Sequence, residues 1–125
     1  MAEPEFGRWN LIKIMKDNFD FIAYLKYRTT DEGGRYSPAQ SGYRPQVRFD
    51  FEKITSSGRQ LFINKEWVFP GEDVEAQITL MSPQFFENKL FEGLKFEFIE
   101  EAKIIGIGEI IEIKNETLKK ILKTK

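Results

Sequence analysis

Short segments in which apolar and polar residues alternate recur along most of this chain. An alternation with a period of two places one set of side chains on each face of a β-strand, so each segment is predicted to form a strand with one buried face. The segments that show this pattern are residues 19–27, 47–51, 61–63, 74–80, 94–98 and 104–113. Short strands with turns between them and little helix predict an all-β fold, either a closed barrel or a sandwich.

Residues that break strands separate these segments. Gly33-Gly34 interrupts a polar stretch after the first segment, and a loop with Pro38, Gly42 and Pro45 follows. The residue before each proline is pushed toward extended geometry, so this loop has limited freedom. Further turns are predicted at residues 56–58, 70–73 and 100–103.

Two glycines lie on one face of the last predicted strand. Gly106 and Gly108 are spaced by two, which places both on the same side. Glycine inside a strand marks a tight bend or a close approach by another part of the chain, and the expected neighbour here is a second backbone segment.

The two ends of the chain differ from the alternating part. Residues 1–16 resemble nothing downstream in character and are set aside as an N-terminal extension, either native or left from recombinant expression. The barrel domain is predicted to span residues 17–114, and residues 115–125 form a basic tail or a short helix capped by Asn115. One side of that helix would carry Leu118, Ile121 and Leu122. The lysines of the tail indicate either a solvated terminus or a weak phosphate contact.

Composition narrows the classes of function. The chain has 125 residues, of which 41% are hydrophobic, enough for one globular core. It has no Cys and no His, which excludes disulfides, thiol catalysis and the usual general base. The net charge is −1, whereas a domain that binds nucleic acid over much of its surface is strongly basic. We therefore expect a protein that is not an enzyme and that uses neither metal nor cofactor.

The sequence also bears on location. No apolar run approaches the roughly 20 residues that a membrane span needs, and the start of the chain lacks a basic region followed by an apolar one. The absence of Cys agrees with a reducing compartment. These features predict a cytoplasmic protein that does not contact the membrane.

A loop rich in Arg and Tyr is the most informative local feature. It carries Arg35, Tyr36, Tyr43 and Arg44 between the prolines and glycines described above. Arginine grips carboxylate or phosphate with a planar fork, and tyrosine adds contact area at low entropic cost. The loop is therefore either a contact surface or a structured connection whose glycines and prolines fix its path.

Several motifs in this order resemble the C-terminal, third domain of elongation factor Tu. The residues that carry the resemblance are Asp31-Glu32-Gly33-Gly34-Arg35, Gly42-Tyr43-Arg44-Pro45-Gln46, Phe69-Pro70-Gly71-Glu72-Asp73-Val74, Gly93-Leu94-Lys95-Phe96 and Ile105-Gly106-Ile107-Gly108. The resemblance implies a six-stranded antiparallel closed barrel. In that family GTP is bound by a preceding domain whose residues this sequence does not contain, so GTP binding is not expected.

The family's domain holds the T-stem backbone of aminoacyl-tRNA and contacts protein partners. The positions that correspond to its RNA-facing residues are Arg35, Tyr36, Gln46, Thr55 and Glu100. Tyr36 replaces a family His, and Glu101 and Ala102 replace two glycines of a turn. An added carboxylate repels a phosphate backbone, which counts against tRNA binding of the family type. The loop of residues 84–93 is also four residues longer than in the family.

These observations predict a non-enzymatic binding module linked to translation. A protein partner is the first hypothesis, and the tRNA backbone is the alternative. The candidate contact residues are Arg35, Tyr36, Tyr43, Arg44, Gln46, Thr55 and Glu100. For Arg44 a structural role, in which its side chain bonds to carbonyl groups of the loop, stays open beside the binding role.

Overall fold

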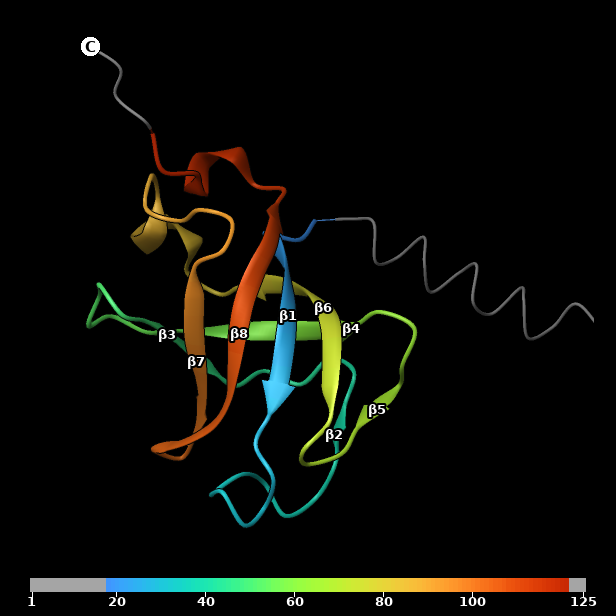
Figure 1. The fold of residues 1–125 in the computed structure, drawn as a ribbon. Coiled ribbons are helices and arrows are strands. Elements are labelled where there is room, and N and C mark those ends of the chain that lie inside the picture. The colour runs from blue at the N-terminus through green and yellow to red at the C-terminus, as the bar shows by residue number, and fades with distance from the viewer. Residues whose placement is uncertain (1–17, 122–125) are drawn as a thin grey trace, which may run out of the picture.

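The protein folds as a closed β-barrel of antiparallel strands (Figure 1), seen in a computed structural model that describes residues 18–121. The barrel strands are β1 (Phe21–Tyr27), β3 (Gln46–Phe49), β4 (Ser56–Phe62), β6 (Asp73–Leu80), β7 (Lys95–Glu100) and β8 (Lys103–Ile113). They follow one another around the barrel in the order β1-β6-β4-β3-β7-β8, and β8 pairs with β1 to close it. The six-stranded antiparallel barrel predicted from the motifs is confirmed.

Two small additions flank the barrel. Strands β2 (Ala39–Gln40) and β5 (Trp67–Val68) pair as a two-stranded sheet beside it. Two single 3₁₀ turns, η1 (Pro83–Phe86) and η2 (Glu116–Leu118), lie together at the end of the barrel where β7 begins. The additions therefore occupy the loops, and the irregularities of the barrel wall itself are register shifts at Ile22/Ala23 and Phe98/Ile99.

The interior is filled by the residues that the alternation predicted on β1, β6 and β7. Phe21, Ala23 and Leu25 are fully buried, while the intervening side chains face outward. The Phe96 ring lies between two other rings, with its centroid 5.8 Å from that of Phe21 and 5.6 Å from that of Phe49. This aromatic packing holds opposite walls of the barrel together.

The two glycines of β8 make room for this packing. Gly106 pairs with Phe98 and Gly108 with Phe96 across the β7–β8 ladder. A Cβ atom on Gly108 would lie 2.2 Å from Cζ of Phe96, and one on Gly106 would lie 2.1 Å from Cζ of Phe98. The predicted close approach is present, but aromatic rings make it. A backbone atom takes part only at Gly106, where the carbonyl oxygen of Lys26 would lie 2.8 Å away.

The prediction of a turn at residues 56–58 is wrong. Ser56 and Gly58 begin β4 and face the interior, and a Cβ on Gly58 would lie 2.7 Å from Cγ2 of Val47. Small residues fit this crowded part of the barrel. In the sequence, the same run of Ser and Gly is typical of a surface turn, which is why the strand was not predicted here. Further along β4, Phe62 is the buried residue, while Leu61 is half-buried on the outer side.

A second prediction fails at Phe51, which was expected on the buried face of its strand. Strand β3 ends at Phe49, and the amide of Glu52 donates to the Phe49 carbonyl in a turn. The Phe51 side chain is 46% exposed and stacks on the outside of the Phe49 ring, with centroids 5.6 Å apart. The turn therefore breaks the alternation one residue before Phe51.

The tail is folded onto the barrel as far as residue 121. The Asn115 side chain accepts a hydrogen bond from the Thr117 amide, so the predicted cap is confirmed, although the helix is a three-residue 3₁₀ turn. Leu118 is fully buried, whereas Ile121 is 63% exposed. A purely solvated tail is therefore wrong for this part. Leu122, Lys123 and Lys125, like the extension of residues 1–16, lie outside the described residues.

Candidate binding face around the β7–β8 turn

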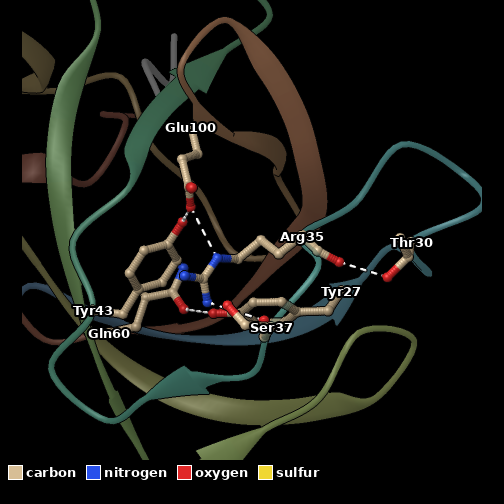
Figure 2. Close-up of polar contacts among 7 residues, drawn as sticks. All are labelled: Tyr27, Thr30, Arg35, Ser37, Tyr43, Gln60 and Glu100. Atoms are coloured by element: carbon tan, nitrogen blue, oxygen red, sulfur yellow. Dashed lines mark hydrogen bonds and ion pairs between the residues drawn. The ribbon is translucent and has the colours of Figure 1, made fainter.

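Three predicted contact residues meet at the end of β7 (Figure 2). The Arg35 side chain donates from Nε to Oε1 of Glu100 at 2.9 Å, and the Tyr43 hydroxyl donates to the same oxygen. The guanidinium carbon of Arg35 lies 4.6 Å from the centroid of the Tyr43 ring. Arg35, Tyr43 and Glu100, which are distant in sequence, thus form one polar cluster.

The loop that carries Arg35 is closed by its own hydrogen bonds. The amide of Gly34 donates to the Thr29 carbonyl at 2.9 Å, and the Thr30 hydroxyl donates to the Arg35 carbonyl at 2.6 Å. A Cβ on Gly34 would lie 2.4 Å from the Arg28 carbonyl oxygen, so only glycine allows this tight fold. The glycine pair therefore aims Arg35 at Glu100.

Arg35 also fastens the loop that follows it. Its Nη1 donates to the Ser37 carbonyl at 3.3 Å, and its side chain is only 19% exposed. The loop-fastening role left open for Arg44 is therefore filled by Arg35. Arg44 is exposed and has no hydrogen bond or ion pair with any residue in the range 18–121.

A buried pair that sequence reasoning missed lies beneath the cluster. The Tyr27 hydroxyl donates to Oε1 of Gln60, and both residues are buried. Burial raises the pKa of Tyr27, and burial followed by the hydrogen bond to Glu100 raises the pKa of Tyr43. Both hydroxyls therefore stay protonated and act as donors, which makes the cluster a structural support.

The accessible residues surround this support and form what we call the β7–β8 face. Its members are Tyr36, Arg44, Gln46, Thr55, Glu101 and Lys103. Tyr36 is 85% exposed, and the Lys103 ammonium lies 5.2 Å from the centroid of its ring. The Thr55 hydroxyl donates to Oε1 of Gln46 at 3.0 Å, so these two predicted residues satisfy each other. The face therefore combines one prominent aromatic ring with a few charges.

The turn at the centre of this face has an unusual backbone. Glu101 and Ala102 join the two strands with φ values of 49° and 68°. Two-residue hairpins favour this geometry, but they normally use Asn or Gly because other L-residues are strained there. The resemblance implies glycine at both positions, whereas this chain adopts positive φ there with Glu101 and Ala102.

We expect Ala102→Gly to raise the free energy of unfolding by about 0.5–1 kcal/mol, since relief of the left-handed strain exceeds the added entropy of the unfolded chain. Chemical denaturation would measure the gain. The control is Glu109→Gly in the middle of β8, where glycine should lower stability by roughly 0.5–1 kcal/mol. A loss of stability in Ala102→Gly would contradict the strain argument.

Neither a cluster of potential metal ligands nor a membrane-spanning helix is found among residues 18–121. Between residues 18 and 121, no three acidic side chains converge in a way that could hold a metal ion. In the same range, no helix has the length and apolar character required to cross a membrane. The exposed groups of the β7–β8 face supply aromatic area, hydrogen-bonding groups and charge.

Fold and site together define a small antiparallel β-barrel module with a polar side-chain cluster at the end of one hairpin. The family model of the elongation factor Tu C-terminal domain matches residues 15–114. This span covers most of the chain, and the protein belongs to the elongation factor Tu C-terminal domain family. The resemblance seen in the motifs is confirmed, and the chain carries a translation-associated barrel domain.

Proposed function

We propose that this protein is a non-enzymatic binding module that docks a protein partner of the translation machinery on its β7–β8 face. The observation that supports this proposal is that the Arg35 side chain bonds to Glu100 and packs on the Tyr43 ring within the same chain. Arg35 stands where the family has an RNA-facing arginine, and here its charge is neutralised at short range. Tyr36 and Arg44 are left as accessible groups, and Tyr and Arg are the side chains that most often anchor protein interfaces.

The remaining charges of the face favour a protein over a phosphate backbone. Binding to nucleic acid gains most of its free energy when free cations replace counterions on the phosphates. On this face Glu101 sets an exposed carboxylate in the middle of the turn, and Gln46 and Thr55 bond to each other. A protein surface with mixed charges is the better match.

The tRNA backbone is the second candidate, because two cations of the face are accessible. Arg44 and Lys103 are exposed, and the Arg44 guanidinium has no partner among the described residues. These two groups could reach neighbouring phosphates. The alternative therefore predicts binding that depends on Arg44 and weakens steeply as the salt concentration rises.

The expected result is that Arg44→Glu and Tyr36→Ala each release a protein that the wild type captures from ribonuclease-treated lysate. Both side chains are exposed, so neither substitution should disturb the fold. Captured proteins would be identified by mass spectrometry and compared between variants. Lys26→Glu is the matched control, because Lys26 is an exposed cation on β1, across the barrel from β3.

Binding of fluorescently labelled total tRNA at about 50 and about 300 mM salt separates the two candidates. Weak tRNA binding that Arg44→Glu leaves unchanged agrees with a protein partner. Salt-sensitive binding that is lost in Arg44→Glu and kept in Lys26→Glu would overturn the proposal in favour of RNA.

A further inference from the structure

The long loop after β6 and the C-terminal tail form a single structural unit. The amide of Asn88 donates to the Thr117 carbonyl at 2.9 Å, and that of Leu90 donates to the Leu118 carbonyl at 2.8 Å. The amide of Lys120 returns a bond of 2.7 Å to the Leu90 carbonyl, which makes a short parallel pairing. We call residues 83–93 and 115–121 the loop–tail unit.

This unit combines the loop that the resemblance predicts to be longer than in the family with the tail that follows the family match, which ends at residue 114. Phe86, Leu90 and Leu118 are fully buried and belong to the same hydrophobic core as the barrel interior, so the loop and the tail pack onto the barrel together. Figure 1 shows the unit at one end of β7, with the β7–β8 turn at the other end. Whatever the loop–tail unit binds, it does so away from the β7–β8 face.

The loop–tail unit has an apolar hollow on its surface. The hollow has a volume of about 410 Å³ and is bounded by Leu90, Phe91 and Ile113. Phe91 is 44% exposed and also borders a second hollow of about 520 Å³, which Phe51 lines. An exposed ring that borders two hollows offers a place for a large apolar side chain of a partner.

The rim of the first hollow is basic. Lys119 and Lys120 line it, and both are exposed. The nearest carboxylate to Lys119 is that of Glu116, at 3.9 Å, an exposed contact of little strength. The acidic residue of the lining, Glu92, is turned toward the backbone, where it accepts from the Ile113 amide at 3.4 Å. A partner that enters the hollow therefore meets two ammonium groups available for carboxylates.

We propose that the loop–tail unit docks an acidic peptide segment of a partner protein. One large apolar side chain of the segment occupies the hollow beside Phe91, and flanking carboxylates pair with Lys119 and Lys120. The Lys120 ammonium lies over one face of the Phe91 ring, 5.7 Å from its centroid, and would compete there with a nucleic-acid base that stacks on the ring. A peptide side chain can instead enter from the hollow, which favours a peptide over single-stranded nucleic acid.

The test is a titration of the isotope-labelled full chain, followed by amide chemical shifts, with the peptide acetyl-Asp-Glu-Leu-Trp-Glu-Asp-amide up to about 2 mM. We expect saturable shifts at the amides of residues 90–92 and 119–121. Phe91→Ala should weaken binding roughly five-fold or more, as loss of an interface anchor does. Phe85→Ala is the matched control, since Phe85 is 43% exposed in the same unit but lines neither hollow.

Two further peptides and one oligonucleotide complete the experiment. A peptide with Lys in place of each acid, and one with Gly-Ser in place of Leu-Trp, should bind at least about five-fold more weakly. The proposal is overturned if the acidic peptide gives no saturable shifts by about 2 mM, if the shifts lie elsewhere, or if either altered peptide binds equally well. Equal weakening by Phe85→Ala, or preferential binding of an oligouridylate at these amides, would overturn it too.

Discussion

Gly108→Ala is expected to lower the free energy of unfolding by about 2–3 kcal/mol, the upper part of the range for overpacked cores. The new methyl group would lie 2.2 Å from Cζ of Phe96 and 2.6 Å from its Cε2. The ring cannot swing away, because the rings of Phe21 and Phe49 pack against it. For a domain of this size the loss corresponds to a fall of roughly 4–8 °C in Tm for each kcal/mol. Chemical and thermal denaturation would measure both quantities.

A double-mutant cycle tests the cause of this loss. The three heavy atoms nearest to the added Cβ all belong to the side chain of Phe96, so Phe96→Leu should relieve the closest collisions. We expect Phe96→Leu/Gly108→Ala to be more stable than the sum of the two single losses predicts, by about 1 kcal/mol or more. Simple additivity would show that the cost of Gly108→Ala arises from the backbone and not from the collision with the ring.

Leu118→Ala is the second substitution for which we expect a large loss, about 2–4 kcal/mol, because it leaves a cavity in a closed core. Leu118 is fully buried, and its backbone accepts hydrogen bonds from the amides of Lys89 and Leu90. Collapse into the cavity is limited, since those bonds hold the loop in place. Urea denaturation of the full chain would measure the loss.

Ile121→Ala is the matched control for Leu118→Ala. Both substitutions shorten a branched apolar side chain in the same tail, but the Ile121 side chain is 63% exposed. We expect a change within about 0.5 kcal/mol for Ile121→Ala, as for most surface positions. Equal effects of the two substitutions, or a loss below about 1 kcal/mol for Leu118→Ala, would show that the tail is not an integral part of the fold.

Much of the barrel could be predicted because its strands bury alternate residues. Strand β1 alternates without interruption, and the apolar residues predicted to be buried on β1 and β6 are buried, whereas Gln77 of β6, expected to face outward, is buried as well. Most of strand β4 was not predicted, because its inward-facing residues include Ser56, Gly58 and Gln60, which are not apolar. A small residue is needed at Gly58 because side chains of neighbouring strands leave little space there. This packing depends on the closed barrel and cannot be read from the sequence pattern.

The candidate site was predicted as a set of residues but not as an arrangement. Arg35 and Glu100 were both expected to face a partner, and the structure turns them toward each other. Such pairing depends on the register between segments that are 65 residues apart, which a single sequence does not specify. The supports Tyr27 and Gln60 were missed for a related reason, since a buried glutamine leaves no periodic signal.

Closure of the barrel also limits how a partner can be recruited. Every strand of the barrel is hydrogen-bonded on both sides, from β1 around to β8. A partner strand therefore cannot extend the main sheet, which is a common route to both peptide recognition and aggregation. Among residues 18–121, the sheet with strand edges left open is the β2–β5 pair, which is two residues long. Selectivity in this module must therefore come from exposed side chains, on the loops and at the strand ends, and these side chains can change while the barrel stays the same.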